Sequence, residues 1–402
     1  MTPQKKILLL GGLRYLIPVI EAAHRQGYYV ITCDYLPNNI AHKYSDEYIN
    51  ISITDKEAVL QAAKKKNIDG IMSFACDPGV IVASYVQEIM GLPSFGPYKS
   101  VEILQNKDKF RAFLKENGFN VPWAKGFDNI QDALEETTYF SMPCIVKPTD
   151  SAGSKGVTRV DRAEDLHSAL EHAMKHSISG HIIVEEFIDK KGFSSDTDIF
   201  SVNGEISFVN YNAQHFDKNA KNPFTPSAYS WPSTYSNEEQ LYLTSEIQRL
   251  ISLLGMKTLV YNVETCIGIN GKPYIMEVSP RGGGNRLAEM IRHIYGVDMI
   301  TGVTRAMVND PIIPIEQKTS QGHWAEIILH SNKNGYFDEL IIENKFGAEI
   351  IEKDLWIKKG DRINCFEGAN NTIGTLIMKF NSSYEMETAI NNQEKWLKVK
   401  VK

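Results

Sequence analysis

The chain of 402 residues is long enough to form two or three domains with separate hydrophobic cores. Its hydrophobic content of 43% and charged content of 23% are ordinary for a globular protein, and its net charge of −6 leaves no basic surplus for binding nucleic acid. Five scattered cysteines, without a CxxC pair or a Cys/His cluster, predict neither a zinc site nor a disulfide scaffold. No apolar run reaches the ~18 residues of a membrane span, and the N-terminal run is too short for a signal peptide. We therefore expect a cytoplasmic protein that binds neither membrane nor nucleic acid.

The first hundred residues alternate between short apolar runs and amphipathic segments. The pattern predicts strands at residues 6–10, 29–33, 48–53 and 70–74, and helices at residues 15–26, 58–66 and 78–90. This alternation is typical of a doubly wound parallel sheet.

Two features lie at the predicted carboxyl edge of this sheet. The segment after the first strand reads GGLRYL and lacks the G-x-G-x-x-G fingerprint, so a nicotinamide site is disfavoured and the glycines make room for a small ligand. Asp77 follows the fourth strand, where capping the next helix explains it as well as a ligand contact does.

Two polar segments interrupt the apolar pattern between residues 101 and 187. Helical turns are expected over residues 101–117, with Lys107 inside this segment. An apolar run ends at Lys147, and the loop TDSAGSKG (149–156) leads to a strand at 157–161. Such a loop suits an anion held by backbone N–H groups, although a mobile hairpin tip explains it equally well.

A further β run, HIIVEEF, spans residues 181–187 and ends in two acids. Acids are uncommon at the end of a buried strand unless they have partners. Strands around the turn Asn203-Gly204 are expected next, then a long loop at 221–236 and a helix at 238–254. Helices at 286–295 and 298–308 precede a small α/β unit without a chemical motif, residues 320–402.

The stretch 257–286 predicts a hairpin closed by the two-residue turn Asn270-Gly271. In that register Glu264 lies opposite Glu277, and Asn262 lies opposite Ser279. Two facing carboxylates repel each other unless a cation such as Mg²⁺ neutralises them. A solvated hairpin whose acids face water is the alternative.

Four motifs in this order resemble the ATP-grasp superfamily of carboxylate–amine ligases. They are NKDKFRAFLKENG (106–118), PCIVKPTDSAGSKGV (143–157), IIVEEF (182–187), and VYNVE (260–264) with YIMEVSPRGGG (274–284). The resemblance implies an α/β fold of the α+β ATP-grasp type. It comprises a doubly wound parallel α/β domain (1–100), a central two-subdomain clamp (101–315, with a flap subdomain at about 120–187) and a small β-rich α/β lid (316–402).

The resemblance also implies roles for single residues. Phosphate contacts are expected from Lys107 and Lys147, and from a flap over the triphosphate that includes Ser151, Gly153, Ser154, Lys155 and Gly156. The adenine would be held by Glu185, Glu186 and Phe187, and the metal by Glu264, Glu277 and Ser279, the last replacing an Asn found in many members. Arg281 would face the γ-phosphate and the acyl phosphate. Ser194 stands where many members have a ribose-binding acid, and Asp196 or Asp198 would substitute for it.

The implied activity is ATP-dependent amide or peptide-like bond formation through an acyl phosphate, with release of ADP and phosphate. Its cofactors would be ATP and Mg²⁺, with Mn²⁺ as a substitute, and its partners a small carboxylic acid, such as an amino acid, and an amine. A purine-pathway phosphoribosyl-amine ligase resembling glycinamide ribonucleotide synthetase is the second enzyme reading. A non-catalytic ATP-binding regulatory protein is the alternative of another class. A homodimer is compatible with the resemblance.

Overall fold

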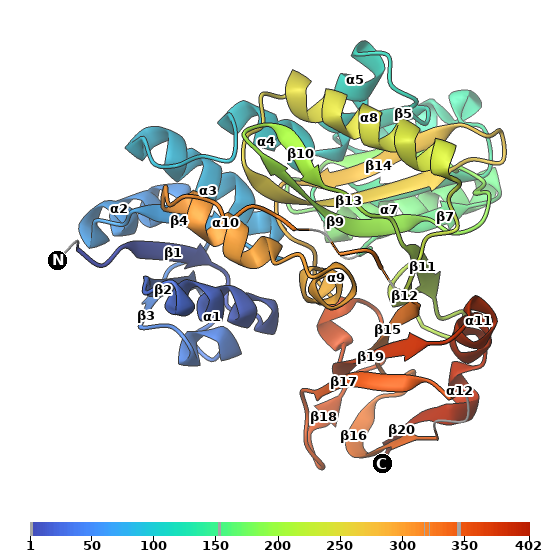
Figure 1. Ribbon diagram of the computed structural model, residues 1–402. Helices are drawn as coiled ribbons and strands as arrows, with labels where there is room; N and C mark the ends of the chain where they lie inside the picture. The colour runs from blue at the N-terminus through green and yellow to red at the C-terminus, as the bar shows by residue number, and fades with distance from the viewer. Residues whose placement is uncertain (1–2, 152–153, 317, 321, 344–346) are drawn as a thin grey trace.

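A computed structural model describes residues 3–151, 154–316, 318–320, 322–343 and 347–402. Figure 1 shows three regions: a blue N-terminal unit, a green and yellow central unit beside it, and an orange and red C-terminal unit below. Within the described ranges, no helix is long and apolar enough to cross a lipid bilayer.

The N-terminal unit is the expected parallel sheet covered by helices. Its four strands run in the order β3-β2-β1-β4, and all neighbours are parallel. The strands are β1 (Lys6–Leu10), β2 (Tyr29–Asp34), β3 (Glu47–Asn50) and β4 (Gly70–Ser73). The helices are α1 (Ile17–Arg25), α2 (Lys56–Lys66) and α3 (Asp77–Met90), with 3₁₀ turns η1 (Arg14–Leu16) and η2 (Ile40–Lys43).

The helical turns expected over residues 101–117 belong to two helices. They are α4 (Tyr98–Gln105) and α5 (Lys107–Glu116). Asn106 separates them in an extended conformation, and its side chain caps α5 by accepting from Lys109 N at 3.0 Å. Lys107 is therefore the first residue of α5, not an interior one.

The central unit contains two four-stranded sheets. The first has the order β5-β8-β6-β7 and consists of β5 (Ala124–Phe127), β6 (Cys144–Pro148), β7 (Thr158–Val160) and β8 (Ile182–Glu186). Beside it lie α6 (Ile130–Glu135), η3 (Thr137–Tyr139), η4 (Ala163–Asp165) and α7 (Leu166–His176). The second has the order β10-β9-β13-β14 and consists of β9 (Ser195–Val202), β10 (Glu205–Phe208), β13 (Leu259–Ile267) and β14 (Pro273–Ser279). Helix α8 (Asn237–Leu253) contacts β10 and β14, and α9 (Leu287–Tyr295) and α10 (Met299–Met307) follow the sheet in sequence (Figure 1).

The C-terminal unit contains strands from both sides of the boundary expected at residue 315. Its main sheet has the order β11-β12-β15-β19-β17 and consists of β11 (Ala213–Phe216), β12 (Pro226–Trp231), β15 (His323–Leu329), β17 (Glu349–Leu355) and β19 (Gly374–Phe380). Strand β12 lies inside the segment expected to be a loop, so that expectation was wrong over residues 226–231. The remaining elements are β16 (Gly335–Ile342), β18 (Arg362–Ile363), η5 (Ala369–Asn371), α11 (Ser383–Asn391), α12 (Gln393–Trp396) and β20 (Leu397–Val401).

The buried cores differ in how they join these units. One continuous core joins the N-terminal sheet to the β10-β9-β13-β14 sheet, through residues such as Leu8, Phe110, Phe200 and Val303. The β5-β8-β6-β7 sheet has its own core, which includes Val146 and Val184. The strands β9, β13 and β14 are therefore fixed to the N-terminal unit, whereas the other sheet of the clamp packs as a separate body.

The β13–β14 hairpin has the expected acid pair but not the expected turn. Gly268 N donates to Lys272 O at 2.9 Å, so the loop has three residues, 269–271, and the prediction of a two-residue turn was wrong. The ladder then shifts register between Glu264 and Thr265, where β14 carries one extra residue, Met276. The longer loop and the bulge cancel, and Glu264 still pairs with Glu277.

Candidate active site

Six polar residues form two rows across neighbouring strands β9, β13 and β14. In one row Asp196 pairs with Glu264, which pairs with Glu277. In the other row Asp198 pairs with Asn262, which pairs with Ser279. Side chains two residues apart share a face of a strand, so both rows lie on one side of the sheet.

Burial keeps several of these acids from ionising easily. It raises the pKa of Asp196 and of Asp198 to about 7, and Glu264 adds to the effect on Asp196. Burial, with Glu277 beside it, also raises the pKa of Glu264. Among the described residues, no group of three His, Cys, Asp or Glu side chains is close enough to hold a metal ion. Facing carboxylates without a complete protein cage fit Mg²⁺, which takes its other ligands from phosphates and water.

Asn262 connects the two rows. Its Nδ2 donates to Asp196 Oδ1 at 2.8 Å and to Asp198 Oδ1 at 3.2 Å. Gly283 N also donates to Asp198 Oδ1, at 2.8 Å. A Cβ at position 283 would lie 2.8 Å from the same oxygen, so glycine is required for this approach.

The lysines predicted to contact phosphates lie beside the acid rows. Lys107 Nζ is 3.8 Å from Glu277 Oε2 and donates to Ser151 O at 3.0 Å. Lys147, on β6, donates to Glu185 Oε1 on the neighbouring strand β8. Both cations are half-buried, and Lys147 lies close enough to Glu264 to oppose the rise in its pKa.

Arg111 is a third buried cation that the sequence motifs did not single out. It lies one helical turn after Lys107, and its Nε donates to Glu185 Oε2 at 3.1 Å. Its Nη1 donates at 2.8 Å to the carbonyl of Met276, the bulged residue of β14. Arg111 therefore joins β8 to the hairpin that carries the acid pair. The four-residue spacing from Lys107 is the signal that could have found it.

The three residues predicted to contact the adenine differ in their exposure and in their partners. Glu185 is buried, with its carboxylate bound by Arg111 and Lys147. Glu186 is exposed, and its carboxylate accepts from Trp123 N at 3.2 Å. The ring of Phe187 lies under the guanidinium of Arg159 at 4.1 Å. Of the three, Glu186 is exposed and Phe187 is half-buried, whereas Glu185 is buried.

The predicted flap touches a distant loop. Ser154 Oγ donates to Phe224 O at 3.0 Å, and Asn222 Nδ2 donates to Ser154 O at 3.1 Å. Lys155 is exposed and Gly156 is buried with a left-handed φ of 73°. Gly153, which the resemblance also placed in the flap, lies outside the described residues.

Arg281 is held by the N-terminal unit. Its Nη2 and Nε donate to the two oxygens of Asp77, at 2.7 and 2.9 Å, and Ser279 Oγ donates to Asp77 Oδ1 at 3.0 Å. Ser279, expected among the metal ligands, thus donates its hydroxyl hydrogen to Asp77, and its role as a metal ligand stays a prediction. Neither Asp77 nor this contact follows from the motifs, because the partners are 204 residues apart.

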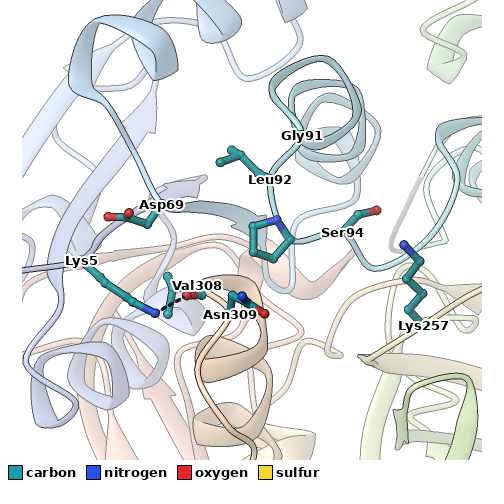
Figure 2. Close-up of a pocket in the computed structure, with 9 residues that line it drawn as sticks. Lys5, Asp69, Gly91, Leu92, Ser94, Lys257, Val308 and Asn309 are labelled. Carbon is teal, nitrogen blue, oxygen red and sulfur yellow. Dashed lines mark hydrogen bonds between the residues drawn. The ribbon is translucent and has the colours of Figure 1, made fainter.

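A surface hollow of about 490 Å³ lies elsewhere in the protein. Figure 2 shows its lining residues: Lys5, Asp69, Gly91, Leu92, Pro93, Ser94, Lys257, Val308 and Asn309. Lys5 and Asp69 precede β1 and β4, whereas Asp77 follows β4. The hollow is therefore at the amino edge of the parallel sheet, and the lysine and acid rows lie at the other edge.

The fold and the site define a class of α/β protein in which cations from one antiparallel sheet and from helix α5 lie beside a second sheet that carries paired acids. A family model described as "ATP-grasp domain" matches residues 140–289, which include every strand of the two sheets except β5. This part of the chain therefore matches the ATP-grasp domain family.

Three known proteins illustrate the range of relatives. The carbamoyl phosphate synthase large chain of Clostridium perfringens (strain SM101 / Type A) is 22% identical over 329 residues, 78% of this chain but 30% of the relative. The formate-dependent phosphoribosylglycinamide formyltransferase of Wolinella succinogenes is 28% identical over 284 residues, 69% of this chain and 70% of the relative. The solved structure of an L-amino acid ligase from Bacillus licheniformis matches all of both chains with a TM-score of 0.80 at 21% identity. The chain thus spans less than a third of the first relative's length, and the structural likeness shows a shared fold.

Proposed function

We propose that this protein is an ATP-dependent ligase that joins the carboxylate of an amino acid or related small acid to an amine. The observation that carries the proposal is the Glu264–Glu277 pair with Lys107 Nζ 3.8 Å from Glu277. Paired acids beside a cation suit a magnesium–triphosphate complex, and ATP with Mg²⁺ is the cofactor pair of ATP-grasp enzymes.

The reaction would proceed in two balanced steps. An oxygen of the acid attacks the γ-phosphorus of ATP, the bond to ADP breaks, and an acyl phosphate forms. The amine nitrogen then attacks the acyl carbon, phosphate leaves with the bonding electrons, and the nitrogen loses a proton. A bound Mg²⁺ would supply neutralisation of phosphate charge.

The chain's own groups would act mainly by charge and position. Lys107 and Lys147 would neutralise phosphate oxygens, Glu264 and Glu277 would hold the metal, and Arg281 would face the transferred phosphoryl group. Lys155, Ser151 and Ser154 would cover the triphosphate as parts of the flap, and Asp196 would contact the ribose. The contact between Ser154 and the loop at Asn222 and Phe224 supports a flap that excludes water.

One acid argues against a phosphoribosyl substrate at the edge of the N-terminal sheet. Asp34 is buried there and accepts from Leu36 N at 3.0 Å and Asn39 Nδ2 at 3.1 Å. A phosphate would be repelled by this carboxylate unless a cation intervened. Asp77, at the same edge, is already paired with Arg281 and adds nothing to this argument.

The test is ADP release from MgATP in the presence of the common L-amino acids, singly and in pairs, with mass spectrometry of the product. Pair-dependent ADP release with an amide product supports the proposal. If no pair of amino acids causes ADP release, the proposal is overturned. If ADP release requires phosphoribosylamine and glycine, the protein is instead a phosphoribosyl-amine ligase.

A further inference from the structure

Glu326 on β15 is a buried carboxylate that the proposed reaction does not use. Its exposure is 0%, and among the described residues neither carboxylate oxygen has a hydrogen-bond partner. Burying an unpartnered carboxylate is costly, and native proteins seldom retain one without a role. Burial raises the pKa of Glu326 well above its usual range; the charge of Arg286 opposes this rise, and Glu289, Glu352 and Asp198 add to it.

The neighbours of Glu326 connect it to the acid rows. Tyr229, on β12, is its cross-strand partner. The Tyr229 hydroxyl donates to Asp196 Oδ2 at 3.0 Å and accepts from Asn285 Nδ2 at 3.3 Å. Tyr15 donates in turn to Asn285 Oδ1 at 3.4 Å. A chain of polar groups thus runs from the N-terminal unit past Glu326 to β9.

Asp198 offers a second unpartnered oxygen at the same place. The residue is 0% exposed, and while Oδ1 is bonded to Gly283 and Asn262, Oδ2 has no partner among the described residues. Asp198 is also one of the charges that act on Glu326. Two buried acids with unpartnered oxygens therefore lie close enough to interact electrostatically.

The nearby cations act on these acids without an ion pair to either of them among the described residues. Arg286 directs its guanidinium to Glu289 at 2.8 Å, Glu352 at 2.6 Å and the hydroxyl of Thr375 at 3.1 Å. Its charge opposes the rise in the pKa of Glu326, and the charge of Arg281 opposes the rise in the pKa of Asp198.

The backbone beside this region is strained. Asn285 and Arg286 are consecutive non-glycine residues with φ of 52° and 62°, a conformation that L residues rarely adopt. Such strain is costly and tends to persist where it positions functional groups. Here it places the Asn285 amide between two tyrosine hydroxyls.

We propose that Glu326 and Asp198 form the binding site for the ammonium group of an amino-acid substrate, with Tyr229 and Asn285 lining it. This inference rests on the proposed function and names the substrate as a zwitterion. Arg281, two residues before Gly283, provides the cation on the other side of the loop for the substrate's carboxylate. An α-amino acid carries an ammonium group and a carboxylate a few atoms apart. A carboxylate of the protein on one side of Gly283 and a guanidinium on the other would complement these two charges.

Entry to this site involves two domains. Tyr15 packs edge-on against Trp356, with ring centroids 5.7 Å apart, so the N-terminal and C-terminal units meet beside the region. Since both oxygens of Glu326 are covered, the units around Tyr15 would have to separate for the substrate to enter.

The test uses the isosteric variant Glu326→Gln and calorimetric titration in the presence of MgADP. The probes are the common L-amino acids and, for each that binds, the hydroxy acid that has OH in place of NH₃⁺. Wild type should prefer the amino acid by about tenfold or more, the scale of one charge-assisted hydrogen bond, and Glu326→Gln should lose the preference. The dissociation constant for ADP should not change, and the exposed-site variant Glu205→Gln should behave as wild type.

Two results would overturn the inference. One is an unchanged preference in Glu326→Gln, even if removal of the buried carboxylate raises its melting temperature. The other is equal affinity of wild type for the amino and hydroxy acids, or binding of neither. Binding is measured without turnover, so the two proposals can fail separately. A protein that prefers amino acids but releases no ADP with any pair would contradict the ligase reaction and still support the ammonium site.

Discussion

Glu185 shows how one carboxylate can organise the cations of this site. Burial alone would raise its pKa, but Arg111 and Lys147 outweigh burial and lower the pKa to about 2. A glutamate in this position stays ionised at neutral pH and fixes both cations. In the structure its carboxylate positions Lys147, and the adenine contact that the resemblance implies stays a prediction.

The buried acids of β9 have raised pKa values, in contrast to Glu185, and this predicts that the stability of the protein depends on pH. Asp198 has a pKa of about 7 in the folded protein, above the ~3.9 of an unfolded chain. Between these values the folded state binds the extra proton, so the free energy of unfolding falls as the pH rises from about 4 to 7. Without metal or nucleotide, Asp198→Asn should flatten this decline and raise the melting temperature at pH 8 by a few degrees.

The measurement is a series of thermal melts from pH 5 to 8. Asn keeps an oxygen for the Gly283 N–H, so the loop contact is retained. Asp196 would continue to titrate in the variant, so the slope should be reduced and not abolished. A slope equal to that of wild type would contradict the buried, protonated state of Asp198.

At the scale of single elements, the hairpin shows what sequence pattern can and cannot predict. The Asn-Gly pair and the strand pattern located the hairpin and the facing acids. They did not reveal that the loop has three residues or that Met276 forms a bulge. One extra loop residue and one extra strand residue offset each other, so the acid pair keeps the same register. The bulge is stabilised by Arg111, which is 165 residues away in sequence.

Other elements differ for similar reasons. The break between α4 and α5 depends on Asn106 as a cap, a local signal hidden inside a continuous helical pattern. Strand β12 lies in a segment rich in Pro, Ser and Tyr, and it forms because β15, almost 100 residues later, pairs with it. Lys107 and Lys147 were predicted from motifs, whereas Asp77, Tyr229 and Glu326 acquire their roles only through partners distant in sequence.

Arg111 links two elements, so its replacement should be costly. Arg111→Met should lower the free energy of unfolding by about 3 kcal/mol, because it leaves Glu185 buried with one cation fewer. Arg162→Met is the matched control, since Arg162 pairs with Glu164 and Asp165 at the exposed start of α7 and should cost less than about 1 kcal/mol. Urea denaturation measures both. Equal effects of the two substitutions would show that the buried pair does not join the elements.

At the scale of the whole molecule, two kinds of contact hold the units in place. The shared core fixes the acid-bearing sheet to the N-terminal unit, and Asp77 adds a polar contact by holding Arg281. The cation-bearing sheet has a separate core and is joined to the acids through Lys107, Arg111 and the flap. A substrate bound between them would therefore contact both bodies.

Asp77 makes the N-terminal unit part of the site, although we do not expect it to touch the nucleotide. Asp77→Asn removes the charge that orients Arg281 and should lower kcat by about 10- to 100-fold, the scale of a misplaced catalytic group. The dissociation constant for MgADP should be unchanged, because ADP lacks the γ-phosphate. Steady-state kinetics and nucleotide titration separate these effects, and Asp165→Asn on the surface is the control. An unchanged kcat would contradict the positioning role.

The central claim is that Glu264 and Glu277 form the metal end of a nucleotide site. The most direct measurement is Mn²⁺ binding by electron paramagnetic resonance, with and without ADP, in wild type, Glu277→Gln and the exposed-site control Glu205→Gln. We predict ADP-dependent Mn²⁺ binding in wild type and in Glu205→Gln, and a loss of affinity of about tenfold or more in Glu277→Gln with an unchanged melting temperature. Equal Mn²⁺ affinity in Glu277→Gln and wild type would contradict the claim.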